Sequence, residues 1–90
     1  MKNLEQMYNV IINKRVLKTL DKIPVIYLLK IKEAVNNLKK NPRPFGCVKL
    51  SNSDKAYRFR IGIYRIIYTI EDNILTVEVI KIDHRSNIYK

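Results

Sequence analysis

The sequence predicts an α+β domain in which two N-terminal helices pack on one face of an antiparallel sheet, in the order β-α-α followed by three or four strands. Residues 56–68 alternate between apolar and mostly basic side chains around a glycine, which is typical of a β-hairpin. Apolar residues recur at helical spacing between 24 and 40, as on a helix that faces a core. The 90 residues, 47% of them apolar, are expected to form a single domain spanning 1–90.

The chain is expected to begin with a short lead, residues 1–7, to which we assign no role. Residues 8–12 are rich in β-branched and aromatic side chains, which predicts a first strand. Asn13 is a suitable N-cap for a helix over 14–20, because its side chain can accept a hydrogen bond from a free backbone N–H of the first turn.

Pro24 predicts the first turn of a second helix, since proline fits a position where no N–H is needed. The helix is expected to run to about residue 40 and to end before the Asn-Pro-Arg-Pro segment at 41–44. Its apolar stripe consists of four residues, Leu28, Ile31, Val35 and Leu38.

The second half predicts an antiparallel meander. Asp72-Asn73 is expected to form a two-residue turn before the last strand, which places Leu75 opposite Ile70. Beyond Ile80 the alternation breaks, and we expect a bulge or an unpaired strand end there. The sequence therefore does not determine which face of the sheet His84 and Arg85 occupy. The expected strands cover 47–50, 55–61, 64–71 and 74–82.

The hairpin register follows from a turn at Gly62-Ile63, where glycine can adopt the positive φ of a type II′ turn. One face of the hairpin is then apolar and is expected to join the core: Tyr57, Phe59, Ile61, Tyr64, Ile66 and Tyr68. The other face brings three arginines together: Arg58, Arg60 and Arg65.

Like charges directly opposite each other destabilise a sheet, and a merely solvated face would more often mix Thr, Lys and Glu. The arginines are therefore interpreted as a polyanion site on a rigid strand pair. The alternative is a basic outer face without a role.

The formal net charge is +10, with 18 Lys and Arg against 8 Asp and Glu, which indicates a polyanionic or acidic partner: nucleic acid, an anionic membrane or an acidic protein. Cys47 is the one cysteine and His84 the one histidine. They predict neither an intrachain disulfide nor a metal site, and no cofactor is expected. No apolar run is long enough to span a bilayer, so we expect a cytoplasmic protein without membrane association.

Two segments resemble the RelE/ParE superfamily of type II toxins, most closely the RelE-like branch, and the resemblance extends over about residues 8–89. The first segment reads Arg-x-Gly-x-Tyr-Arg-x-x-Tyr, with Arg60, Gly62, Tyr64, Arg65 and Tyr68. The second is the closing His-Arg-x-x-x-Tyr, with His84, Arg85 and Tyr89. Members of the branch are ribosome-dependent mRNA endonucleases, so the resemblance implies cleavage of mRNA in the ribosomal A site, growth arrest, and inhibition by a cognate RelB-like antitoxin.

The family's functional positions fall on five residues of this sequence: Arg58, Arg60, Arg65, Arg85 and Tyr89. Several RelE-like toxins carry lysines on the first hairpin strand, one of them thought to be the general base, whereas this chain has arginines there. Arginine holds its proton too tightly to be a good base at neutral pH, which leaves the base position open.

RNA cleavage by the substrate's own 2′-hydroxyl needs a base, cations for the pentavalent phosphorane and an acid for the leaving 5′-oxygen, without a metal. Arginines suit the second task, His84 is a candidate for proton transfer, and Tyr89 could stack on a base. The catalytic candidates are Arg60, Arg65, His84, Arg85 and Tyr89. The candidates for RNA binding are Lys55, Arg58 and Lys81.

Two other interpretations of the sequence stay open. A ParE-like toxin on the same fold poisons DNA gyrase and is a binding module, not an enzyme. A basic RNA-binding domain without catalysis would instead expose aromatic side chains among its basic residues.

Overall fold

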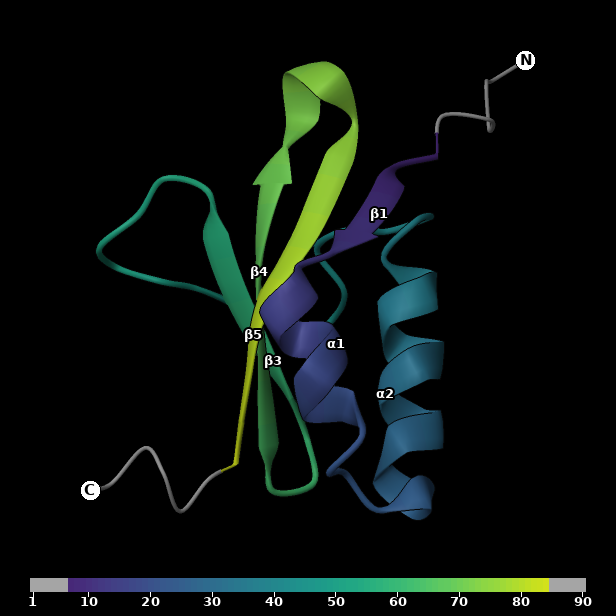
Figure 1. Ribbon diagram of the computed structural model, residues 1–90. Helices are drawn as coiled ribbons and strands as arrows, with labels where there is room; N and C mark the ends of the chain where they lie inside the picture. The colour runs from purple at the N-terminus through teal and green to yellow at the C-terminus, as the bar shows by residue number, and fades with distance from the viewer. Residues whose placement is uncertain (1–6, 85–90) are drawn as a thin grey trace.

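The computed structural model describes residues 7–84 of the chain, and these form two helices packed against a five-stranded sheet (Figure 1). The strands lie in the order β1-β5-β4-β3-β2. The elements are β1 (Asn9–Ile12), α1 (Lys14–Leu20), α2 (Val25–Asn37), β2 (Val48–Lys49), β3 (Ala56–Ile61), β4 (Tyr64–Glu71), the 3₁₀ helix η1 (Asp72–Ile74) and β5 (Thr76–His84).

The predicted α+β class and the two N-terminal helices on one face of the sheet are confirmed (Figure 1). The sheet is mixed, however, where the sequence predicted an antiparallel one. β1 pairs with the last strand, β5, and runs parallel to it, with Val10 opposite Val77. Alternation along a strand shows which side chains share a face, but it contains no signal for the direction of a partner about 70 residues away.

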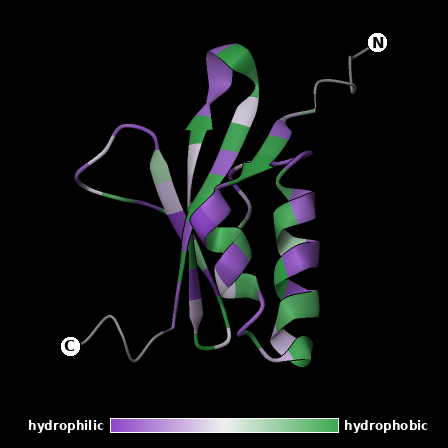
Figure 2. Cartoon of the chain, in the orientation of Figure 1, coloured by the Kyte–Doolittle hydropathy of each residue, from purple (hydrophilic) through white to green (hydrophobic). Residues whose placement is uncertain are grey.

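Both helices direct apolar side chains at the same side of the sheet. In Figure 2 each helix alternates between hydrophobic and hydrophilic residues along its length. Asn13 caps α1 as predicted, its side chain accepting a 2.9 Å hydrogen bond from the Arg15 N–H. The residues least exposed to solvent come from α2 with its C-cap and from the two strands β4 and β5: Ile31, Leu38, Ile66, Tyr68, Val77 and Val79.

The predicted hairpin register is confirmed at every pair, including Arg60 opposite Arg65 and Ile61 opposite Tyr64. Gly62 has φ +61°, the left-handed region that the turn was predicted to require. A Cβ at this position would also lie 2.5 Å from a ring carbon of Tyr27. Glycine therefore allows both the turn and the close packing of the hairpin tip on α2.

The β4–β5 connection differs from the predicted two-residue turn. It consists of η1 and then Leu75 at φ 47°, so that Val77 rather than Leu75 pairs with Ile70. The shift is by two residues, which keeps Val77 on the core face. Of the two alternatives expected near Ile80, a bulge or an unpaired strand end, the structure has the bulge: Tyr68 pairs with Val79 and Ile67 with Lys81, so Ile80 is the extra residue.

Candidate active site

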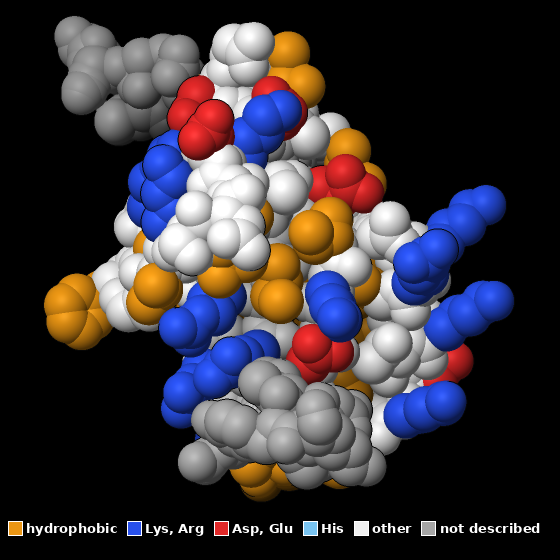
Figure 3. Space-filling model, turned by 90° about the vertical axis from the view of Figure 1, so that its left-hand side faces the viewer, with side chains coloured by type: hydrophobic (Ala, Val, Ile, Leu, Met, Phe, Trp, Pro, Cys, Tyr) orange, Lys and Arg blue, Asp and Glu red, His pale blue; other side chains and the backbone are white. Residues whose placement is uncertain are grey.

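The face of the sheet opposite the helices, called the open face below, brings basic side chains of three strands together. Arg60 lies opposite Arg65 on the neighbouring strand, and Arg65 lies opposite Asp83 on the next. The following row consists of Arg58, Ile67 and Lys81. Residues directly opposite on a sheet have Cβ atoms about 5 Å apart. Figure 3 views the molecule from this side, where Lys and Arg side chains gather around a central apolar area.

The three predicted arginines have no acidic partner within residues 7–84, where the ion pairs involve other cations. Arg60 is exposed, whereas Arg58 and Arg65 are half-buried. The Nε atom of Arg65 is buried and has no hydrogen-bond partner. A buried donor without a partner costs free energy, and the described part of the chain leaves this group unsatisfied.

The first hairpin strand also borders a hollow of about 570 Å³. Arg58 and Arg60 line it together with the segment around Phe45, a residue whose side chain is fully exposed. β2 is only two residues long and reaches no further than Arg58. The outer edge of β3 beside Arg60 therefore stays accessible at the point where the arginines lie.

Lys55 and Lys81, the two lysines predicted to bind RNA, both have acidic neighbours. The Lys55 ammonium is ion-paired with Glu71, near the far end of the sheet from the hairpin tip. Lys81 lies 3.5 Å from Asp83 and is next to the arginine rows. Of the two lysines, only Lys81 is thus grouped with the arginines.

His84 lies on the other side of the sheet from the arginines. It is opposite Tyr64 in the register, and the two rings meet edge-on with centroids 5.4 Å apart. Tyr64 is buried and meets Tyr27 of α2 in the same way, also at 5.4 Å. The histidine ring thus belongs to an aromatic group on the helix-bearing face. Arg85 and Tyr89, the remaining predicted site residues, lie outside the described residues.

Asp83 is the residue near the arginines that the sequence did not single out. If alternation continued without a break from the turn at Asp72-Asn73, both Lys81 and Asp83 would lie on the core face. The extra residue at the bulge, Ile80, returns them to the open face. A bulge was expected near this point, and counting one extra residue there would have revealed the acid.

One arginine outside this site has several partners within the described residues. Arg43 forms hydrogen bonds of 3.2 and 2.8 Å with the two carboxylate oxygens of Asp72, and its Nε donates to the Tyr57 hydroxyl at 3.1 Å. Its guanidinium also lies over the Tyr57 ring, 5.2 Å from the centroid. The Tyr8 hydroxyl donates to the same carboxylate at 2.6 Å.

These contacts shift the pKa values of the groups involved. The hydrogen bonds from Arg43 and Tyr8 lower the pKa of Asp72, since they favour its charged form. The bond with Asp72 raises the pKa of Arg43 and of Tyr8. This group joins the β4–β5 connection, the start of β1 and the segment after α2, so it holds the fold together at the end away from the hairpin tip.

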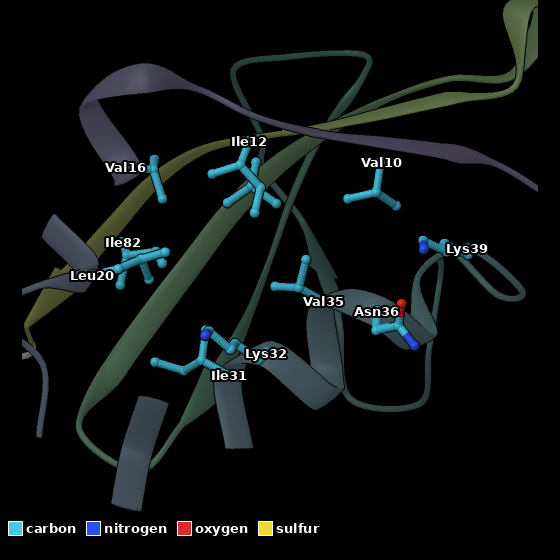
Figure 4. A pocket seen from close by; sticks show the side chains of 11 residues that line it. Val10, Ile12, Val16, Leu20, Ile31, Lys32, Val35, Asn36, Lys39 and Ile82 are labelled. Atoms are coloured by element: carbon cyan, nitrogen blue, oxygen red, sulfur yellow. The ribbon is translucent and has the colours of Figure 1, made fainter. Parts of the chain in front are cut away.

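A second hollow, of about 310 Å³, lies between the helices and the sheet (Figure 4). Its walls are mostly apolar, with Val35 and Ile31 of α2 facing Val10 and Ile12 of β1, and Lys32 and Lys39 among its lining. It contains no acid, histidine or cysteine. Within residues 7–84 no group of three or more His, Cys, Asp or Glu side chains could hold a metal ion.

The protein-family model that describes the ParE toxin of the type II toxin–antitoxin system matches residues 10–89 of the chain. The fold and the basic open face therefore belong to a class of small toxins from such systems. The chain is 42% identical to the putative toxin RelE1 of Methanocaldococcus jannaschii over 88 residues, which cover 92% of this chain and 96% of the relative. It is 31% identical to the toxin RelG of Mycobacterium tuberculosis over 74 residues, 81% of this chain and 85% of the relative.

A solved structure gives the same result. The archaeal RelE–RelB complex of Pyrococcus horikoshii contains a chain that superposes with a TM-score of 0.80 at 30% identity, over 88% of this chain and 96% of that one. The protein belongs to the ParE/RelE toxin family, and it is a toxin of the RelBE type. No helix within the described residues is long and apolar enough to cross a membrane.

Proposed function

We propose that the protein is an endoribonuclease that cuts mRNA in the A site of the ribosome and thereby inhibits translation. The observation that supports this most directly is the pair Arg60 and Arg65, two arginines directly opposite each other on neighbouring strands that form no ion pair among the described residues. Such a pair of arginines is suited to bind a phosphodiester, because each planar guanidinium can donate two parallel hydrogen bonds to phosphate oxygens.

The same pair is suited to the reaction as well as to binding. When the 2′-hydroxyl attacks the adjacent phosphorus, negative charge accumulates on the non-bridging oxygens of the phosphorane. Arginines already held in place by a sheet stabilise that charge without reorganising. Arg58 on β3 and Lys81 on β5 lie in the next row, where they would bind neighbouring phosphates.

We further propose that a RelB-like antitoxin controls the activity. The relative from Pyrococcus horikoshii is a RelE–RelB complex. This chain has a net charge of +10, and Val25, Ile26 and Leu29 on α2 are each more than 60% exposed. Exposed apolar residues in a basic protein fit a partner with an acidic, amphipathic segment.

The test is primer extension on a reporter mRNA after brief induction of the toxin in growing cells. We expect new 5′ ends inside translated codons and none in a copy of the reporter that lacks a ribosome-binding site. Co-expression of the antitoxin from the neighbouring reading frame should abolish them. Intact mRNA together with gyrase-dependent DNA breaks would instead establish the other branch of the family, a gyrase poison.

A further inference from the structure

One carboxylate lies among the cations of the open face. Asp83 is directly opposite Arg65 and two strands from Arg60, and neighbouring strands are about 4.8 Å apart. A phosphate held by the two arginines would thus lie beside the Asp83 side chain.

A hollow gives access to this carboxylate. It has a volume of about 300 Å³ and lies between α1 and the end of β5, with Arg15, Thr19, Lys81 and Asp83 among its lining. The Asp83 side chain is 23% exposed, and its partner Lys81 is 61% exposed and 3.5 Å away. The hollow exposes the Asp83 side chain at the edge of β5 that faces α1.

The other groups nearby are poor acceptors of a proton. Arginine and lysine are protonated at neutral pH, and the ring of His84 rests against Tyr64 on the opposite face of the sheet. Glu78 is on the open face too, but it lies opposite Thr69, beyond the two arginine rows, and accepts a hydrogen bond from Asn13 at 3.5 Å. Within residues 7–84, Asp83 is therefore the carboxylate best placed to act on a phosphate at Arg65.

We infer that Asp83 is the general base of the cleavage reaction, an inference that rests on the proposed endoribonuclease function. The 2′-hydroxyl transfers its proton to the Asp83 carboxylate as the O2′–P bond forms and the P–O5′ bond breaks. The leaving 5′-oxygen takes a proton from water, and the hydroxide produced takes the proton from Asp83. The products are a 2′,3′-cyclic phosphate and a free 5′-hydroxyl, and the carboxylate is regenerated.

The position of the acid has a consequence that separates catalysis from binding. A negative charge in the middle of a surface that binds phosphate weakens binding, because like charges repel. Loss of this charge should therefore leave RNA binding unchanged or tighter. If Asp83 only tunes electrostatics, its removal should also preserve or accelerate cleavage; if it is the base, cleavage should fall while binding does not.

The experiment compares Asp83→Asn with wild type in single-turnover cleavage of an mRNA on purified, programmed ribosomes, with ribosome binding measured in parallel. We expect cleavage to fall by about 100-fold or more, the usual size of a general-base contribution, with binding equal or tighter. Asp83→Glu should recover part of the rate, because it restores a carboxylate. Glu78→Gln is the matched control, since it removes the same charge from the same strand and face, and it should cut at the wild-type rate.

The pH profile of the wild-type protein is an independent measurement that needs no variant. The charged groups facing Asp83 are Lys81 on its own strand, Arg65 on β4 and Arg15 on α1, none of a type that ordinarily titrates between pH 5.5 and 7.5. With an aspartate as base the rate should be flat over this range, whereas a histidine base would make it rise through the histidine's titration.

The outcomes separate the two proposals. An Asp83→Asn protein that cleaves within about threefold of the wild-type rate would overturn the role of Asp83. A wild-type cleavage rate that rises between pH 5.5 and 7.5 would overturn it as well. Either result would leave the endoribonuclease proposal standing. Ribosomes whose mRNA stays intact with wild-type protein would overturn both.

Discussion

Arg43 and Arg65 lie at opposite ends of the sheet and differ in the contacts that the fold supplies to their guanidinium groups. Arg43 has the carboxylate of Asp72, the hydroxyl of Tyr57 and the face of an aromatic ring within contact distance. Arg65 lies between Arg60 and Asp83 in the register but forms no ion pair with a described residue, and its buried Nε has no hydrogen bond. Both are partly exposed side chains of the same type, so the difference comes from their neighbours.

The comparison distinguishes a structural charge from a functional one. The partners of Arg43 connect segments that are far apart in the chain, and they are joined to it by hydrogen bonds. Arg60 and Arg65 repel each other on a rigid strand pair, a cost that a folded protein retains when a ligand compensates it. We therefore expect substitutions at the two ends to affect different measured quantities.

The largest expected effect is the loss of toxicity when an open-face arginine is removed. Arg60→Ala and Arg65→Ala should each reduce mRNA cleavage by about 100-fold to 1000-fold, since each removes a donor to the charged transition state. Growth arrest after induction should weaken or disappear. Lys22→Ala, which removes one positive charge from the connection after α1, is the control and should arrest growth like the wild type. Loss of soluble, folded protein in both arginine variants would show that these residues are structural.

A smaller effect, on stability alone, is expected at the buried hydroxyl near Arg43. Tyr68 is fully buried, and its hydroxyl donates a 2.8 Å hydrogen bond to the Pro42 carbonyl. Burial raises the pKa of this hydroxyl, so it stays protonated and a donor across the physiological range. Tyr68→Phe keeps the ring but leaves the carbonyl unpaired, which should lower the free energy of unfolding by about 1–3 kcal/mol. Urea unfolding of the two proteins measures this loss of stability. An unchanged unfolding midpoint would mean that water replaces the hydroxyl as the donor to the Pro42 carbonyl.

The smallest expected effect is the pH dependence of the bond between Arg43 and Asp72. Because the pKa of Asp72 is lowered in the folded protein from its ordinary value of 3.8, its contribution to stability is present above that pH and is lost as the pH falls below it. The melting temperature of the wild type should exceed that of Asp72→Asn at pH 7, and the difference should shrink below pH 4. A difference that stays constant down to pH 2.5 would argue against this contact.

The sequence predicted the parts of the fold that depend on local pattern. Strict alternation and one glycine were sufficient for the hairpin register, and with it for the juxtaposition of Arg60 and Arg65. The alternation works because side chains on a strand repeat every two residues. A break in this pattern near Ile80 was enough to predict a bulge or an unpaired strand end, and the structure has the bulge.

The parts that sequence could not predict depend on contacts between distant residues. Nothing in the pattern of β1 indicates that it runs parallel to β5. The bond between Arg43 and Asp72 joins residues 29 positions apart, and no spacing rule relates them. The face of Asp83 depends on the location of one extra residue in β5, so an error of one position moves the acid to the opposite side of the sheet.

Arg43→Ala and Arg65→Ala, compared in one experiment, distinguish the structural arginine from the functional one. For each variant, single-turnover cleavage on ribosomes and the midpoint of urea unfolding are measured together. We expect Arg65→Ala to unfold at or slightly above the wild-type midpoint and yet to cut at least 100-fold more slowly. Arg43→Ala should cut at near wild-type rate and lose up to about 1 kcal/mol of stability. Two variants that lose cleavage equally, or an Arg65→Ala protein that is unstable and fully active, would contradict this distinction.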